Sequence, residues 1–323
     1  MKKLFLAAAL LALAVPAAMA KNDALSLVPN EAVTVGVVHL TDLRTSPLGA
    51  TLFKETDKIS TDGDAEKFLL DAGLKPSQDI DTVVVATTPR TALGSDVEVL
   101  VALDGRFNVE RLTGALAARG LAKKASPNGA YYLLPEEHKV DRDNQRAAVA
   151  FPDAHLALVG SESAVVRALA SRAAGGTQFL GASALGRDVA RIDPHATAWA
   201  VVDVQRAQRI TGAPRMSTHT PQAQAVNSAL RSVSTVALWA TDNGDSLKLG
   251  AFGLSSDTET LGLLEDTLRG ALSAMRLAVQ DKQPDMVPVL RRFNVARTND
   301  SVTITGSVPA ETFRTWSAKN VTR

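Results

Sequence analysis

A unit of two strands and one helix occurs twice in this chain, and it constrains the fold more than any other feature. The first copy, Thr82 to Gly120, reads TVVVATT, a turn, VEVLVAL and then DGRFNVERLTGALAARG. The second copy, Thr235 to Met275, reads TVALWAT, DNGD, SLKLGAF and then SSDTETLGLLEDTLRGALSAM. In both copies a short apolar run precedes a second run, and a stretch with helical apolar spacing follows. The repetition indicates a tandem duplication.

The segments around the repeated unit also match each other. Val33 to Leu40 and Thr197 to Val204 are strands with apolar residues on both faces, so each is expected to be buried on both sides. Because tight turns join most strands, the sequence predicts the α+β class: two related halves, each an antiparallel sheet with helices packed on one face. Part of the second face must then be covered as well. Whether the two sheets join edge to edge is left open by the sequence.

The closing segments of the two halves can be aligned without gaps. Residues 148–161 align with residues 294–307, and this alignment places Leu158 on Ile304. Each half therefore reads strand, helices, two strands, helix, two strands, helix.

Several helix starts can be predicted from capping residues. Asn108 is expected to cap the helix of the first repeated unit, and Ser161 to cap a helix after the second hairpin. Ser256 and Glu259 have the spacing of a capping box before the long helix of the second unit.

Further helices are predicted outside the repeated unit. Ser46 is expected to cap a helix that begins at Pro47. Apolar residues at helical spacing predict another helix over Pro221 to Val233, and a final helix is expected over Pro309 to Ser317.

The first twenty residues have the pattern of a secretory signal peptide. Lys2 and Lys3 precede a short apolar run, Leu4 to Val15, and Ala18-Met19-Ala20 is a small-x-small cleavage site. Cleavage after Ala20 predicts a periplasmic or secreted protein; an N-terminal membrane anchor is the alternative. No second run of eighteen apolar residues follows, so no transmembrane segment is expected after cleavage.

These observations predict four segments. Their boundaries are a signal peptide at 1–20, a first α+β repeat at 21–172, a linker rich in Gly and Ala at 173–183, and a second α+β repeat at 184–323.

The composition excludes several classes of function. Loss of Lys2 and Lys3 changes the formal net charge from +1 to −1, so no global attraction to nucleic acid is expected. The chain has no cysteine, which excludes disulfides, thiolate nucleophiles and cysteine metal sites. Partner, ligand and oligomeric state are not given by the sequence.

No catalytic or metal-binding motif was found in the sequence. The pair of carboxylates at Asp62-Gly63-Asp64 lacks the later ligands of a calcium loop and is interpreted as solvated. No catalytic residue, no metal ligand and no cofactor are predicted, and the protein is interpreted as more consistent with a non-enzyme than with an enzyme.

One group of polar residues was singled out as a candidate binding site. His39 lies at the end of the first strand, and its counterpart in the second half is Asp203. If a pseudo-two-fold axis relates the halves, the two residues are expected to approach each other near the junction. Asp42 and Arg206 follow the same two strand ends and complete the candidate set. The alternative is that turn backbone and water satisfy these polar groups.

The first half contains three distinctive motifs: the helix start Leu43 to Leu48, the strand entry Asp79 to Asp81 and the turn Gly105 to Phe107. In these motifs the chain resembles a broad group of secreted bacterial proteins of unknown function. The resemblance covers mainly the first half. It implies no activity and assigns no functional residue.

The sequence is most consistent with a non-enzymatic exported protein that binds a ligand or a protein partner in the groove between its two duplicated halves. Two alternatives are a periplasmic carrier of a lipid or other apolar molecule, and a hydrolase whose site is assembled only in three dimensions.

Overall fold

The computed structural model describes seven stretches of the chain, which are residues 24–46, 49, 63–90, 97–135, 146–211, 233–281 and 283–312. The predicted signal peptide, most of the helix predicted from Pro47, the predicted helix at 221–233 except Val233, and most of the final helix lie outside these residues.

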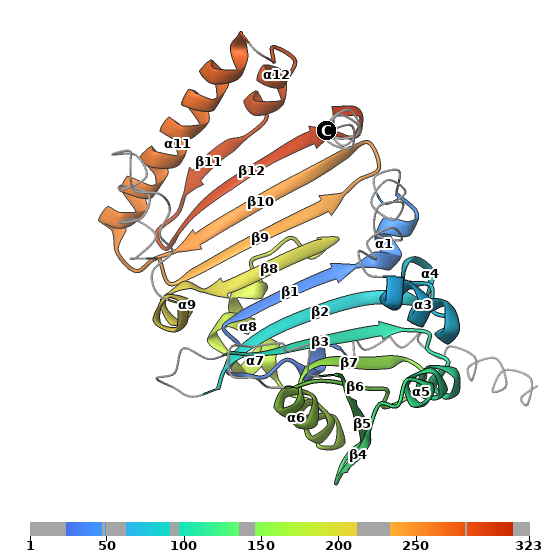
Figure 1. The fold of residues 1–323 in the computed structure, drawn as a ribbon. Coiled ribbons are helices and arrows are strands. Elements are labelled where there is room, and N and C mark those ends of the chain that lie inside the picture. Colours follow the sequence, from blue (N-terminus) through green and yellow to red (C-terminus); the bar gives the residue numbers. More distant parts are fainter. Residues whose placement is uncertain are drawn as a thin grey trace, which may run out of the picture.

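A single antiparallel sheet forms the centre of the molecule (Figure 1). Its strands in chain order are β1 Thr34–His39, β2 Ile80–Pro89, β3 Val97–Gly105, β4 Lys123–Ser126, β5 Gly129–Leu133, β6 Ala147–Ala150, β7 Leu156–Ser161, β8 Ala198–Asp203, β9 Thr235–Asp242, β10 Ser246–Leu254, β11 Asn294–Arg297 and β12 Ser301–Pro309. Their order across the sheet is β11-β12-β10-β9-β8-β1-β2-β3-β7-β6-β5-β4.

The two halves of the chain contribute the same strand order, read outward from the centre of the sheet. The first half runs β1-β2-β3-β7-β6, with the hairpin β4–β5 added at its edge, and the second half runs β8-β9-β10-β12-β11. The halves meet where β1 pairs with β8, with Gly36 opposite Ala200 in the middle of the register. The question left open by the sequence is thereby answered: the two sheets are joined edge to edge.

The helices complete an α+β fold, as predicted. They are η1 Leu25–Leu27, α1 Leu40–Arg44, α3 Gly63–Ala72, α4 Pro76–Asp79, α5 Val109–Ala118, α6 Glu162–Ala173, α7 Phe179–Ala182, α8 Ala184–Val189, α9 Val204–Thr211, α11 Thr258–Gln280 and α12 Met286–Arg291. The helices η1, α1, α4, α7, α8, α9 and α12 and the strand β4 were not predicted.

One face of the sheet, here called the packed face, carries the main core. Side chains from the first half, such as Val35 and Leu158, and from the second half, such as Val201 and Phe252, belong to one continuous cluster. Buried residues of η1, α6, α7 and α8 cover this face, and Phe179 of α7 is 1% exposed. Since this cluster crosses the junction of the halves, both halves contribute to one hydrophobic core.

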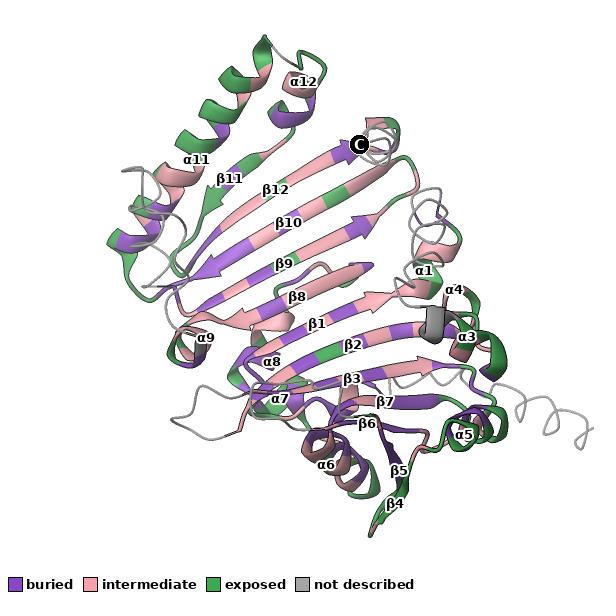
Figure 2. Ribbon diagram, viewed as in Figure 1, coloured by how far each residue is buried: buried purple, intermediate pink, exposed green. Residues whose placement is uncertain are grey.

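Within the described stretches, helices cover the opposite face, here called the open face, only toward its two ends. In the first half, α3 and α5 pack over it with a cluster that includes Phe107 and Leu112. In the second half, α11 packs over it with a cluster that includes Leu261 and Val302. Figure 2 shows buried and less buried residues alternating along the central strands, as expected when only one face is covered.

The predicted helix caps have three different outcomes. Asn108 caps α5 as predicted, and its side chain accepts a hydrogen bond from the Arg111 amide. Ser161 occupies the cap position of α6, but its hydroxyl accepts from the Val99 amide of the adjacent strand. The capping box at Ser256 is wrong: Asp257 is the cap of α11, because its carboxylate reaches the Glu259 amide and the Thr260 hydroxyl.

The gapless alignment of the closing segments is wrong by one residue. Leu158 pairs with Ala102 and lies in the core of the packed face, whereas Ile304 pairs with Ala251 and lies on the open face. A shift of one residue moves a strand side chain to the other side of a sheet. The structural counterpart of Ile304 is therefore Val159.

Candidate ligand-binding groove

The open face holds a cavity of about 630 Å³ that crosses the junction between the halves. It is here called the junction groove. Its lining on the open face consists of side chains from six strands and one aromatic ring, namely Gly36, Val38, Val83, Val85, Ala198, Ala200, Leu238, Ala240, Leu249, Ala251, Ile304 and Phe293. The volume lies within the range of small-molecule binding sites.

The strand registers explain why these residues share one surface. Two rows run across the sheet: in one row Val85, Gly36 and Ala200 are neighbours, and this row continues through Leu238 and Ala251. The second row lies two residues along each strand, so its side chains point to the same face. The groove is thus a direct consequence of antiparallel pairing between the two halves.

Small residues form the floor of the groove, and larger apolar residues rise around it. At the junction, Gly36 faces Ala200, so the centre of the open face is low. Val85 beside Gly36 and Leu238 beside Ala200 are related by the duplication, and they are 38% and 55% exposed. Exposed large apolar side chains on both sides of a floor of small residues are typical of a binding surface.

The groove has no polar side chain among its described lining residues. The backbone N–H and C=O groups of its strands are engaged in the sheet. A molecule bound here is therefore held by apolar contact, and any buried polar group of that molecule finds no partner on the floor. General acid–base and nucleophilic chemistry both need side chains that this surface does not supply.

The structure does not bring His39 and Asp203 together. The His39 amide donates to the Thr197 carbonyl, whereas the Asp203 amide donates to the Val33 carbonyl. Since β1 and β8 are antiparallel, the two residues lie at opposite ends of the strand pair, about six residues or 20 Å apart. A pseudo-two-fold axis through the middle of an antiparallel pair places the equivalent ends of the two strands at opposite ends of the pair, measured along the strand direction.

Each predicted site residue has a local structural partner. His39 Nδ1 lies 3.5 Å from the Thr82 hydroxyl, and an Asp203 carboxylate oxygen accepts from the Arg206 amide at 2.9 Å, as a helix cap does. Asp42 is an exposed residue in the first turn of α1, and its carbonyl accepts from the hydroxyl of Thr45. A ligand-binding role for His39, Asp42, Asp203 and Arg206 stays a prediction.

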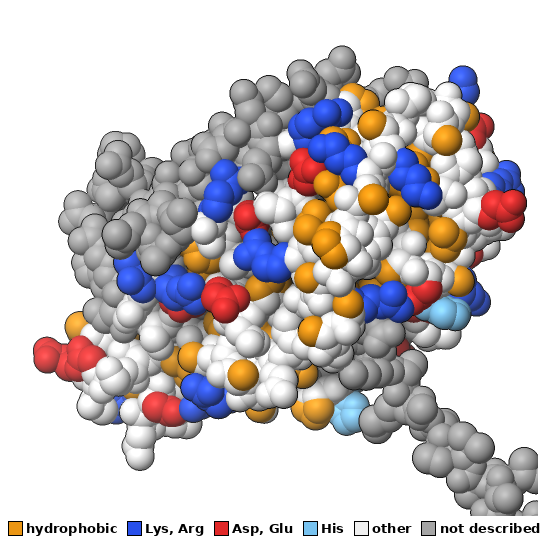
Figure 3. All heavy atoms as spheres, turned by 90° about the horizontal axis from the view of Figure 1, so that it is seen from below, with side chains coloured by type: hydrophobic (Ala, Val, Ile, Leu, Met, Phe, Trp, Pro, Cys, Tyr) orange, Lys and Arg blue, Asp and Glu red, His pale blue; other side chains and the backbone are white. Residues whose placement is uncertain are grey.

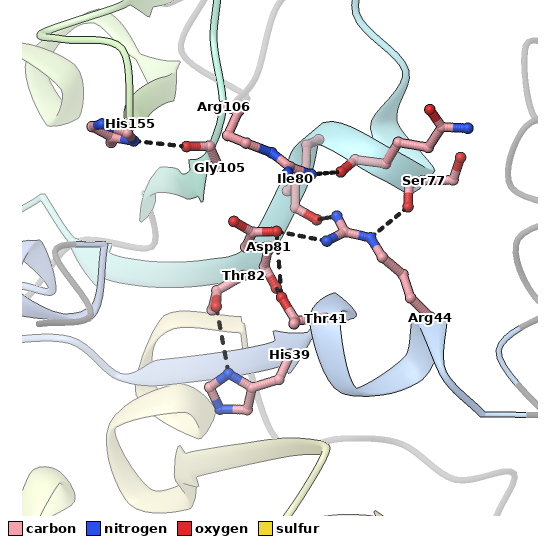
Figure 4. A network of polar contacts seen from close by, with 11 residues as sticks. His39, Thr41, Arg44, Ser77, Ile80, Asp81, Thr82, Gly105, Arg106 and His155 are labelled. Carbon is pink, nitrogen blue, oxygen red and sulfur yellow. Dashed lines mark hydrogen bonds and ion pairs between the residues drawn. The ribbon is translucent and has the colours of Figure 1, made fainter. Parts of the chain in front are cut away.

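The three motifs behind the family resemblance converge at one corner of the sheet (Figure 4). Arg44 donates to the carbonyls of Ser77 and Ile80 and forms a 2.6 Å ion pair with Asp81. Arg106 donates its amide to the Asp79 carbonyl at 2.7 Å. Each of the three nitrogens of the Arg44 guanidinium makes one of these contacts, so the motifs join α1, α4, β2 and the end of β3.

The largest shift of pKa belongs to a structural pair away from the groove. The Tyr131 hydroxyl donates to Glu162 at 2.7 Å, and this bond together with burial raises the pKa of Tyr131 to about 12. The same bond, assisted by Lys124, lowers the pKa of Glu162. Both groups join the hairpin β4–β5 to the start of α6.

The remaining charged side chains of the described ranges are dispersed. No cluster of three or more His, Asp or Glu ligands occurs in the part of the chain that the structure covers. On the face in Figure 3, basic side chains lie in separate groups, several of them beside acidic ones. Of the helices in the described stretches, none combines the length and apolar character needed to span a bilayer.

A groove between the halves was predicted, but its lining residues were missed because polar residues at strand ends were expected to form the site. The signal that could have found them was the doubly apolar character of the first strand of each half. That pattern was interpreted as a second face needing cover, yet Val38 and Ala198 line a surface that the described residues leave open.

Comparisons with known proteins support the fold only. No protein-family model matches the chain, and no curated protein matches it, in agreement with a resemblance to no characterised family. Crystal form III of TP0453 is similar with a TM-score of 0.50 at 13% identity, over 90% of this chain and 95% of that one. Crystal form IV of TP0453 has a TM-score of 0.49 at 13% identity, over 89% and 93% of the two chains.

Proposed function

We propose that this chain is an exported, non-catalytic binding protein that holds an apolar ligand in the junction groove. The signal-peptide pattern of residues 1–20 supports the export, and the groove supports the binding. The observation that carries the proposal is a cavity of about 630 Å³ lined by apolar side chains at the junction of two duplicated halves.

Filling the groove tests this proposal. An ideal Cβ at Gly36 meets nothing closer than 3.8 Å, so a larger side chain fits the strand and projects over the groove floor. The chain from Lys21 to Arg323 is titrated with N-phenyl-1-naphthylamine, a neutral apolar dye that fluoresces when bound in apolar surroundings. We expect saturable binding by the parent and at least a roughly tenfold weaker affinity for Gly36→Leu and for Ala200→Leu, since such a loss corresponds to about 1.4 kcal/mol.

The matched control adds the same side chain to the other side of the sheet. Thr305 is exposed and pairs with Gly250, over which the Trp239 ring lies on the packed face. Thr305→Leu is therefore expected to bind the dye as the parent does. Equal binding by Gly36→Leu, Ala200→Leu and the parent, with unchanged unfolding midpoints, contradicts the proposal, and so does a parent that binds no dye.

A further inference from the structure

We infer, on the basis of the proposed function, that the ligand of the junction groove is a lipid with a long unbranched acyl chain, and that Phe293 sets the chain length that the groove accepts. Four features of the described residues lead to this inference: the length of the groove, its width, the placement of its polar groups and the way its two ends are closed.

The groove is long in the direction that crosses the strands. Its lining runs over six neighbouring strands, from β2 to β12, which is five strand spacings or about 24 Å. An extended backbone advances about 1.2 Å per bond, so a saturated chain of roughly 20 bonds is the longest that spans this distance. Along the strands the lining consists of two rows whose centres are about 7 Å apart.

The width and the lack of hydrogen-bonding groups select hydrocarbon over peptide. An α-helix with its side chains is about 10–12 Å across, which is a cross-section of roughly 80 Å² or more. A volume of about 630 Å³ over about 24 Å leaves a mean cross-section of only roughly 26 Å². An extended peptide carries a donor and an acceptor at most residues, and the groove floor has no free partner for them. A hydrocarbon chain needs none, and its lack of charge is complementary to a lining without charged side chains.

Polar groups border the groove at its first-half end. Thr34 and Thr87 pair across β1 and β2, one row beyond Gly36 and Val85 on the same face, and both are half-buried. Their hydroxyls can donate to or accept from a carboxyl or ester group. A ligand with an apolar chain in the groove and a polar head near this threonine pair matches that distribution.

At the other end of the groove, an aromatic ring lies over the second row of the floor. The Phe293 ring lies on Gly306, where an added Cβ would be 2.4 Å from the ring. The Phe293 backbone is held on both sides: its amide donates to the Leu290 carbonyl, and its carbonyl accepts from Arg276 at 3.3 Å. Because Gly306 has no side chain, the Phe293 ring can lie directly over it, where it blocks the second row of the groove.

The two ends differ in how easily they can be lengthened. Beyond Val83, the open face is covered by a cluster of several side chains that belongs to α3 and α5. At the Phe293 end, Ile304 of the first row packs against the α11 cluster, whereas in the second row the Phe293 ring lies over Gly306. Removing the ring exposes Gly306 and lengthens the second row by about one strand spacing, 4.8 Å, or roughly four methylenes.

Competition with saturated fatty acids tests the inference. The parent chain, loaded with the dye used above, is titrated with fatty acids of increasing chain length, each kept below its critical micelle concentration. For the parent, we expect fatty acids to displace the dye with a preferred chain length of at most roughly 20 bonds, the limit set by a groove of about 24 Å. Phe293→Ala is expected to prefer chains that are longer by roughly four methylenes, and Phe293→Trp is expected to prefer shorter chains. Thr34→Val with Thr87→Val is expected to reduce the advantage of a fatty acid over the alkane of equal length.

The control is Leu238→Ala, which trims the middle of the groove. It is expected to weaken all chain lengths alike without moving the preferred length. An unchanged preference in both Phe293 variants, with binding retained, overturns the role of Phe293. A parent that binds the dye but no fatty acid overturns the acyl assignment and leaves the proposed function standing. A parent that binds neither overturns the proposed function itself. If Phe293→Ala does not fold, Phe293→Trp decides the matter.

Discussion

In the first half of the molecule, β2 and β3 lead into α5, a helix of 10 residues that packs with α3 over the open face. In the second half, β9 and β10 lead into α11, a helix of 23 residues that lies over β11 and β12 at the far end of the sheet. The same sequence unit therefore covers the face in one half and leaves its inner strands bare in the other. The junction groove occupies that bare surface and extends over the junction to β2.

The comparison teaches that duplication can create a binding surface without any new motif. Two copies joined edge to edge share one core on the packed face, and the described helices on the open face lie only toward its ends. What differs between the copies is the length and position of one helix. Because of that difference, the groove is asymmetric: it covers more strands of the second half than of the first.

The largest expected loss of unfolding free energy tests whether the two halves unfold as one cooperative unit. Leu112 and Leu261 are each the fourth residue of their helix and are 1% and 0% exposed. Replacing either with alanine is expected to cost about 2–5 kcal/mol of unfolding free energy, because each leaves a cavity. Chemical denaturation measures both, and a single transition is expected since the core crosses the junction.

A control for these variants lies on the same helix. Leu263 is 59% exposed on α11, so Leu263→Ala is expected to change the unfolding free energy by less than about 0.5 kcal/mol. Two separate unfolding transitions, one for each half, contradict the view of a single cooperative sheet.

A smaller loss of stability is expected where, within the described residues, a helix covers the packed face in the first half but not at the equivalent position of the second half. Glu98 on β3 is buried beneath α6, where its carboxylate accepts from the Ser163 hydroxyl at 2.7 Å and pairs with Arg167. The residue at the same register position in the second half is Lys248, which is exposed. Glu98→Ala is expected to cost about 1.5–3 kcal/mol, as for hydrogen bonds to a charged group, and Lys248→Ala under about 0.5 kcal/mol.

Denaturation midpoints at constant pH measure this pair. Equal effects of the two substitutions contradict the assignment of Glu98 to a buried contact with α6. Glu98→Gln separates charge from shape, because it keeps the hydrogen bond from Ser163 and removes the ion pair.

The smallest change in unfolding free energy is expected from substitutions at the N-caps of α5 and α11. Asn108→Ala is expected to cost about 1 kcal/mol, and Asp257→Ala to destabilise as well, whereas Ser256→Ala leaves stability unchanged. Only the aspartate cap titrates. Hydrogen bonds from Thr260 and from the Glu259 amide lower the pKa of Asp257, so its contribution is present above the unfolded-state pKa and is lost as pH falls through the folded-state pKa.

Thermal unfolding measured from neutral to acidic pH tests this difference. The loss of stability at low pH is expected to be smaller in Asp257→Asn than in the parent, and Asn108→Ala to show the same pH dependence as the parent. A destabilised Ser256→Ala variant favours the capping box instead and contradicts the cap seen in the structure.

Local features of the sequence predicted the fold class well and the site poorly. Asn108, the paired hairpins and the long apolar stripe of α11 are signals set by neighbouring residues, and they appear where expected. Asp257 lies one residue after the predicted cap, and the structural counterpart of Ile304 lies one residue after the predicted one, Leu158. In a strand, a shift of one residue exchanges the two faces of the sheet, and packing decides between them.

The amino-acid sequence by itself determined the duplication, the α+β class and the apolar character of the first strand in each half, since these follow from periodicity along the chain. Only the tertiary structure decided that β1 and β8 pair, that His39 and Asp203 lie at opposite ends of that pair, and that Gly36 faces Ala200 on an open surface. The physical reason is that a groove across six strands is built from residues far apart in sequence. Their proximity depends on strand order and register, which no local pattern specifies.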